Sequence, residues 1–106
     1  PEFMDWAFNR KRGKEILQHW KKIPADTDIL ITHGPPFGIL DTNTNNFNTG
    51  CEDLRKIVNK VLPKYHIFGH IHEAYGVVEK EKTTFMNASI LDERYRIKND
   101  PIHFDF

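Results

Sequence analysis

The sequence contains a single cysteine, Cys51, so it cannot form an internal disulfide. This excludes a small secreted domain built on disulfides, and one free thiol fits a reducing compartment. The sequence also has no apolar run near the roughly 20 residues that a membrane span requires, and its first residues lack the pattern of a signal peptide. We therefore expect a cytoplasmic protein with no membrane association.

Net charge is absent too. Fifteen basic residues balance fifteen acidic residues, which leaves no overall field to attract nucleic acid or an anionic lipid surface. We expect no nucleic-acid binding. With 106 residues, the chain has the size of one domain or of part of one.

Two amphipathic helices are predicted from apolar residues at helical spacing. They cover residues 12–22 and 51–62, and a proline follows each one and prevents its continuation. Residues 37–50 follow neither a helical nor a strand period and predict a long surface loop. The stripe expected on the buried side of the second helix consists of Leu54, Ile57, Val58, Val61 and Leu62.

Several short strands are also predicted. Residues 28–32 and 65–68 are apolar runs that are typical of buried strands. Residues 75–79 and 83–87 predict a hairpin around a charged turn, and residues 101–106 alternate in a way that predicts a final strand. Helices that follow short buried strands, with a hairpin later in the chain, indicate an α/β fold with a mixed sheet and flanking helices.

His33 lies between the first predicted strand and a corner formed by Gly34, Pro35 and Pro36. Ligands collect at the carboxyl ends of strands in open α/β sheets, and the prolines restrict the backbone that carries the imidazole. An isolated histidine is nevertheless more often a hydrogen-bonded residue than a ligand. His33 therefore needs a second group to define a site.

That second group follows the next predicted strand, from Gly69 to His72. The glycine permits a bend, and two imidazoles two residues apart can project toward one point. Neutral imidazole binds zinc, iron and manganese, and two ions roughly 3.5–4 Å apart could each take a histidine. We predict that His33, His70 and His72 are metal ligands. Glu73 is either a residue that orients one of these imidazoles or a solvated loop charge.

Other chemically notable residues receive structural interpretations. His19, His66 and His103 are predicted to have surface or packing roles, because each lies within a predicted helix or strand and outside the two clusters. Cys51 is predicted to be a buried or inert thiol, although it begins a helix. The triplet 87–89 fits a glycosylation pattern but follows an apolar strand, which favours a structural role.

The two histidine motifs, from Thr32 to Pro36 and from Gly69 to His72, resemble those of the calcineurin-like metallophosphoesterases. The resemblance is closer still to the branch of metallophosphoesterase-domain-containing, or class III cyclic-nucleotide-phosphodiesterase-like, proteins. It spans nearly the whole chain. Further similar segments are residues 6–9, 12–13, 23–24, 27–30, 50–51, 66–68, 73, 75–76, 87–89 and 101–102.

The resemblance implies that residues 1–106 are the carboxy-terminal portion of a single domain, half of a four-layer α/β/β/α sandwich. It also implies that the parent protein is a metal-dependent phosphoric ester hydrolase. Its substrates would be phosphomonoesters or phosphodiesters, cyclic nucleotides among them, and its cofactors two divalent ions of manganese, iron or zinc. By the same resemblance, His33 and His70 would bind one ion and His72 its neighbour.

The family's remaining metal-binding motifs have no counterpart here, because no Asp-x-His, Gly-Asp or Gly-Asn-His precedes His33. Neutral imidazoles supply no negative charge between two dications. We therefore expect the chain alone to be inactive or weak and to require the missing amino-terminal half of the domain. Two alternatives stay open: a non-catalytic metal-binding or docking module with an uncovered apolar face, and a folded domain without metal.

Overall fold

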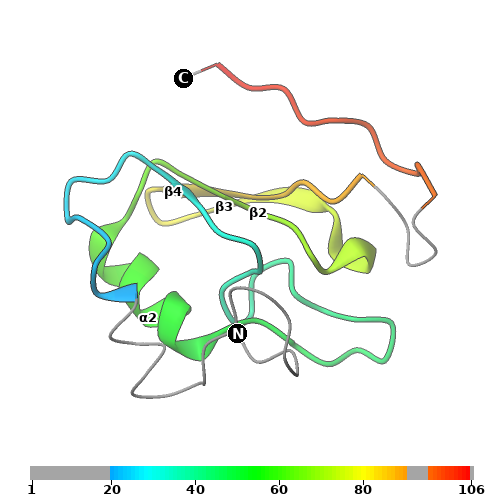
Figure 1. Cartoon of the computed structure of the whole chain (residues 1–106), viewed down its shortest axis with the longest axis horizontal. Coiled ribbons are helices and arrows are strands. Elements are labelled where there is room, and N and C mark those ends of the chain that lie inside the picture. The colour runs from blue at the N-terminus through cyan, green and yellow to red at the C-terminus, as the bar shows by residue number, and fades with distance from the viewer. Residues whose placement is uncertain (1–19, 91–95, 106) are drawn as a thin grey trace.

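The computed structural model describes residues 20–90 and 96–105. Four strands form one sheet in the order β1-β2-β4-β3 (Figure 1). β1, β2 and β4 are parallel, and β3 runs antiparallel to β4. The α/β class and the mixed sheet are thus confirmed. The elements are β1 (Ile29–Ile31), α2 (Glu52–Val61), β2 (Tyr65–Phe68), the short 3-10 helix η1 (His72–Ala74), β3 (Gly76–Lys80) and β4 (Thr83–Asn87).

Helix α2 begins at an unusual cap. The buried Sγ of Cys51 accepts the backbone N–H of Leu54 at 3.4 Å and the indole N–H of Trp20 at 3.4 Å. The predicted buried thiol is confirmed, and it satisfies a donor that the helix start leaves unpaired. At the other end, Leu62 has a left-handed backbone with φ 52° and its N–H bonds to Val58.

The capping position moves Leu62 off the predicted stripe, and its side chain is 38% exposed. The stripe prediction was therefore wrong for Leu62, because a left-handed cap turns its side chain away from the helical row. Leu54 and Val58 do pack against one face of the sheet, through Leu30 and Phe85. This layer of helix on sheet forms the core. Among the described residues, no helix is long and apolar enough to cross a membrane.

The opposite face of the sheet is only partly covered. The carboxy-terminal segment passes over it, on the side away from α2 (Figure 1). There the ring of Phe104 lies 4.6 Å from that of Tyr65, whose hydroxyl donates to the carbonyl of Asp105 at 3.2 Å. Ile31 and Val77, on the same face, remain 72% and 53% exposed.

These contacts bear on the strand predicted at the end of the chain. Residues 101–105 are not a strand, so the predicted final strand was wrong over that range. The ring of Phe104 packs on Tyr65 and the carbonyl of Asp105 accepts the Tyr65 hydroxyl, without the ladder of main-chain hydrogen bonds that defines a strand. Phe106 and nearly all of the predicted helix 12–22 lie outside the described residues.

The long loop over residues 37–50 is organised around one buried carboxylate. Asp41 is 1% exposed, and its Oδ2 accepts the backbone N–H of Gly38 at 2.8 Å and that of Gly50 at 2.9 Å. Both donors lie within the predicted loop. The loop is therefore a fixed structure, because a buried acceptor pairs its two backbone ends.

Replacing Asp41 with alanine is expected to lower the free energy of unfolding by about 2 kcal/mol, because it leaves two backbone N–H groups without their acceptor. Urea unfolding followed by circular dichroism measures the change. The exposed Asp26 provides the matched control, since Asp26→Ala is expected to change stability by less than about 0.5 kcal/mol. Equal losses in the two variants would contradict the role given to Asp41.

Candidate metal centre

The two histidine motifs meet where β1 and β2 end. Beyond the strands, Thr32 donates its N–H to Ile67 at 3.0 Å, and Gly69 donates its N–H to the carbonyl of His33 at 3.0 Å. The main chain of one motif is therefore hydrogen-bonded to the residue that precedes His70. Parallel strands place both carboxyl ends at the same edge, which is why segments far apart in sequence share one site.

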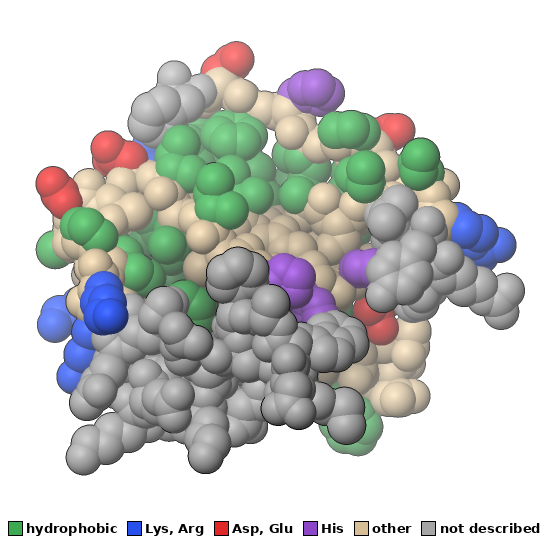
Figure 2. All heavy atoms as spheres, viewed as in Figure 1, with side chains coloured by type: hydrophobic (Ala, Val, Ile, Leu, Met, Phe, Trp, Pro, Cys, Tyr) green, Lys and Arg blue, Asp and Glu red, His purple; other side chains and the backbone are tan. Residues whose placement is uncertain are grey.

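At this edge, His33 and His70 face each other. His33 Nε2 lies 3.1 Å from His70 Nδ1, with the ring centroids 4.8 Å apart and the planes inclined by 49°. Figure 2 shows histidine side chains gathered near the middle of the visible face. In this hydrogen bond one ring donates its N–H to the other, and a shared ion would take the place of that proton.

The separation of these nitrogens fits one bound metal ion. Two nitrogen ligands, each at roughly 2.1 Å from an ion and adjacent in its coordination sphere, lie about 3.0–3.4 Å apart. The observed 3.1 Å falls in that range. His33 and His70 therefore have a geometry in which both can ligate a single ion.

The backbone of His70 is strained. Its φ is 68°, and the N–H of Ile71 bonds to the carbonyl of Gly69 at 2.8 Å, which closes a tight three-residue turn around His70. A left-handed conformation at a histidine of this kind costs on the order of 1–3 kcal/mol and clusters at ligand sites. The turn directs the His70 imidazole toward His33.

The protonation of His70 also suits a ligand. Burial lowers the pKa of His70 below its usual value, and the neighbouring His33 and His72 lower it further, while Glu73 raises it. Neutral imidazole is the form that binds metals. The surroundings thus favour the ligating form of His70 at neutral pH.

His72 and Glu73 lie just beyond this pair, at the start of η1. His72 is half-buried and close enough to His70 to act on its charge. The described residues contain no group of three or more His, Cys, Asp or Glu side chains arranged to hold one ion. The carboxylate of Glu73 accepts the N–H of Thr44 at 3.1 Å, so it ties η1 to the long loop. The ligand role of His72 and the orienting role of Glu73 stay predictions.

Asn87 supports the site through hydrogen bonds to the main chain. Its role in the site was not predicted from the sequence. Its fully buried amide donates to the carbonyl of Ile71 at 2.9 Å and to that of Leu40 at 3.0 Å. Its Oδ1 accepts the N–H of Ser89. The only signal in the sequence was an asparagine at the end of a predicted strand. The structural role expected for the triplet 87–89 agrees with this position.

The histidines outside the two clusters fall as expected where the structure describes them. His66 is fully buried in β2, against the rings of Phe68 and Phe85, and His103 is exposed. Their predicted packing and surface roles are confirmed. His19 lies outside the described residues.

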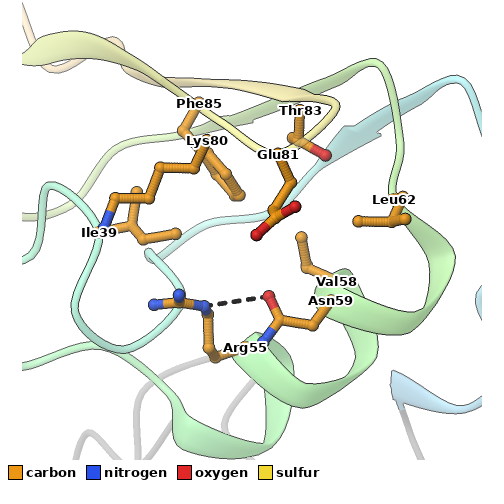
Figure 3. A pocket seen from close by; sticks show the side chains of 9 residues that line it. All are labelled: Ile39, Arg55, Val58, Asn59, Leu62, Lys80, Glu81, Thr83 and Phe85. Carbon is orange, nitrogen blue, oxygen red and sulfur yellow. Dashed lines mark hydrogen bonds between the residues drawn. The ribbon is translucent and has the colours of Figure 1, made fainter.

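A separate cavity of about 560 Å³ lies at the other end of the sheet, between α2 and the β3–β4 turn (Figure 3). Among its lining residues, Arg55 donates to the carbonyl of Phe37 at 2.9 Å and to the Asn59 side chain at 3.1 Å. Lys80 and Glu81 bring opposite charges to its rim. No histidine lines this cavity, so it is distinct from the candidate metal centre.

The α/β fold and the histidine pair can now be compared with known proteins. The family model for calcineurin-like phosphoesterases matches residues 2–74. The matched range contains β1, α2, β2 and all three predicted ligands. The chain belongs to the calcineurin-like phosphoesterase family.

Individual relatives are similar to this chain over nearly its whole length. It is 45% identical over 106 residues to a UPF0046 protein of Caenorhabditis elegans, covering 99% of this chain and 27% of that protein. It is 46% identical over 107 residues to the human metallophosphoesterase domain-containing protein 1, covering 99% of this chain and 33% of that protein. The mouse protein of the same name gives the same values. The chain thus spans about a third or less of the length of these relatives.

Proposed function

We propose that this chain supplies the histidine ligands of a two-metal centre in a phosphoesterase that hydrolyses phosphomonoesters or phosphodiesters, cyclic nucleotides among them. The observation that carries the proposal is the pair of imidazole nitrogens, His33 Nε2 and His70 Nδ1, held 3.1 Å apart at the carboxyl edge of the sheet. Membership of the phosphoesterase family supports the same reaction class.

Within the proposal, each residue has a defined part. His33 and His70 hold one divalent ion of manganese, iron or zinc in their neutral forms, and His72 holds its neighbour. The lowered pKa of His70 keeps its imidazole neutral near neutral pH, which leaves one of its two nitrogens able to bind an ion. When bound, such ions supply a hydroxide nucleophile and neutralise charge on the phosphoryl oxygens.

The proposal also requires partners beyond this chain. Two dications close together need anionic ligands between them, and the three histidines supply none. The proposed source is the remainder of the complete protein, since the chain spans 27% and 33% of the length of two relatives. The proposed substrate is a phosphate ester.

The direct test is a ligand deletion in the complete protein. His33→Ala is expected to lower hydrolysis of an aryl phosphodiester with added manganese about 100-fold, because it removes one of the two ligands that this chain would supply to one ion. His103→Ala changes an exposed histidine and serves as the matched control with wild-type rates. Equal rates in wild type and His33→Ala would sink the assignment.

A second candidate function is a docking module without catalysis. The exposed side chains of Ile31 and Val77, on the sheet face away from α2, favour it, because such apolar surface is typical of interaction sites. Light scattering distinguishes the two candidates in part. A monodisperse monomer of this chain that binds no fluorescent apolar probe would argue against the docking module.

A further inference from the structure

His66 is a buried imidazole that the proposed function does not use. It is fully buried on the helix-facing side of β2, between two phenylalanine rings. Its Nε2 lies 3.0 Å from the hydroxyl of Thr32, the residue directly before His33. The buried group therefore reaches the candidate metal centre through one side chain.

The hydroxyl of Thr32 fixes the direction of this contact. It donates its single proton to the carbonyl of Gly34 at 2.7 Å. Its oxygen can then only accept from His66, so His66 must carry its proton on Nε2. The three groups form a directed chain of hydrogen bonds, from His66 through Thr32 to Gly34.

The other nitrogen of His66 agrees with this assignment. Nδ1 is buried and has no hydrogen-bond partner among the described residues. With the proton on Nε2, Nδ1 is an unpaired acceptor, whereas the alternative tautomer would leave an orphaned N–H in an apolar core. Buried donors without partners are the rarer and costlier case.

The chain of hydrogen bonds spans His33, the candidate metal ligand. Thr32 and Gly34 flank His33, and the side chain of one bonds to the carbonyl of the other. This closes the turn at His33, and His66 anchors it to the core of the sheet. At metal sites, residues that orient a ligand in this way change metal affinity about 10–100-fold when removed.

We propose that His66, acting through the hydroxyl of Thr32, is a positioning residue that fixes the turn carrying His33 for metal binding. This inference rests on the proposed function. It assigns a role to a buried histidine that neither ligates metal nor contacts substrate.

The test removes only the hydroxyl in the complete protein. Thr32→Val keeps the shape of the side chain and is expected to weaken manganese binding about tenfold in calorimetric titration. Thr32→Ser keeps the hydroxyl and is expected to restore wild-type affinity. Thr84→Val makes the same change in β4, at the position paired with Tyr65, and is the control for strand stability. Wild-type affinity in Thr32→Val would overturn the inference.

Two further readouts separate this inference from the proposed function. Long-range ¹H–¹⁵N spectra of the metal-free wild type are expected to show His66 protonated on Nε2, and a proton on Nδ1 would overturn the inference without any variant. If His33→Ala loses manganese binding while Thr32→Val keeps it, the positioning role fails and the proposed function stands. If His33→Ala also keeps binding, the proposed function itself fails.

Discussion

Replacing Gly50 with alanine is expected to lower the free energy of unfolding by about 3 kcal/mol. A Cβ at this position would lie 2.4 Å from the carbonyl oxygen of Pro36 and 2.7 Å from the nitrogen of Phe37. Both are main-chain atoms that no rotamer change can move, so the backbone itself must shift. Guanidinium unfolding followed by circular dichroism measures the loss.

Gly34 provides a matched control for this substitution. A Cβ there would meet nothing within 4 Å, so Gly34→Ala is expected to leave stability unchanged or slightly raised. Similar unfolding free energies for the two variants would contradict the close approach at Gly50.

The contact at Gly50 matters for the candidate metal centre as well. The segment after His33 pairs with the start of α2, since Cys51 donates its N–H to Pro35 at 3.0 Å and accepts that of Phe37 at 3.1 Å. Gly50 lets these two backbones come together. We therefore expect Gly50→Ala to disturb the corner after His33 as well as the stability of the fold.

Lowering the pH from about 6.5 to about 4.5 is expected to destabilise the protein by about 2 kcal/mol through His66 alone. Burial lowers the pKa of His66 to about 3, whereas the unfolded chain titrates near about 6.5. Between these values the unfolded state binds more protons than the folded state. The free energy of unfolding therefore falls as the pH is lowered, by up to about 1.4 kcal/mol per pH unit below about pH 6, and is fully retained only at about pH 7.5 and above.

The contribution of His66 can be isolated by comparison with His66→Gln. His70, whose pKa is also lowered, adds a loss in the same direction to both proteins, so only the difference between their pH profiles reports His66. His103→Gln changes an exposed histidine and is expected to keep the wild-type profile. Parallel profiles for wild type and His66→Gln, measured by urea unfolding from pH 7.5 to 4.5, would show that His66 is not held neutral.

Local patterns were sufficient for most of the fold. Strand β2 covers Tyr65–Phe68, the range predicted from its apolar run, and the hairpin β3–β4 follows the two predicted alternating segments. The predicted helix 51–62 contains α2 with a cap at each end. These elements depend on side-chain periodicity and on proline, which act between residues close in sequence.

The same patterns gave wrong predictions for residues 101–105 and for Leu62, where the main chain does not follow the predicted element. Residues 101–105 alternate like a strand, but they join no strand of the sheet, and the carbonyl of Asp105 accepts the hydroxyl of Tyr65. Leu62 matches the apolar row of α2, but its backbone leaves the helix. Periodicity records which residues are apolar, and it carries no information on which main-chain groups pair.

The candidate ligands could be identified from sequence, and their relation in space could not. His33, His70 and His72 stand out because they follow strand ends and glycine or proline corners. The sequence does not indicate the left-handed turn at His70 or the connection of His66 to Thr32, residues that are 34 positions apart.

The sequence by itself thus determined the types of the elements, their approximate ends and the imidazoles that are candidate metal ligands. Only the tertiary structure decided that His33 Nε2 lies 3.1 Å from His70 Nδ1. It also decided that the buried His66 contacts the hydroxyl of Thr32, next to His33. The physical reason is that strand register and burial arise from hydrogen bonds and packing between distant segments. Local periodicity fixes what each segment is, and long-range pairing fixes what its side chains meet.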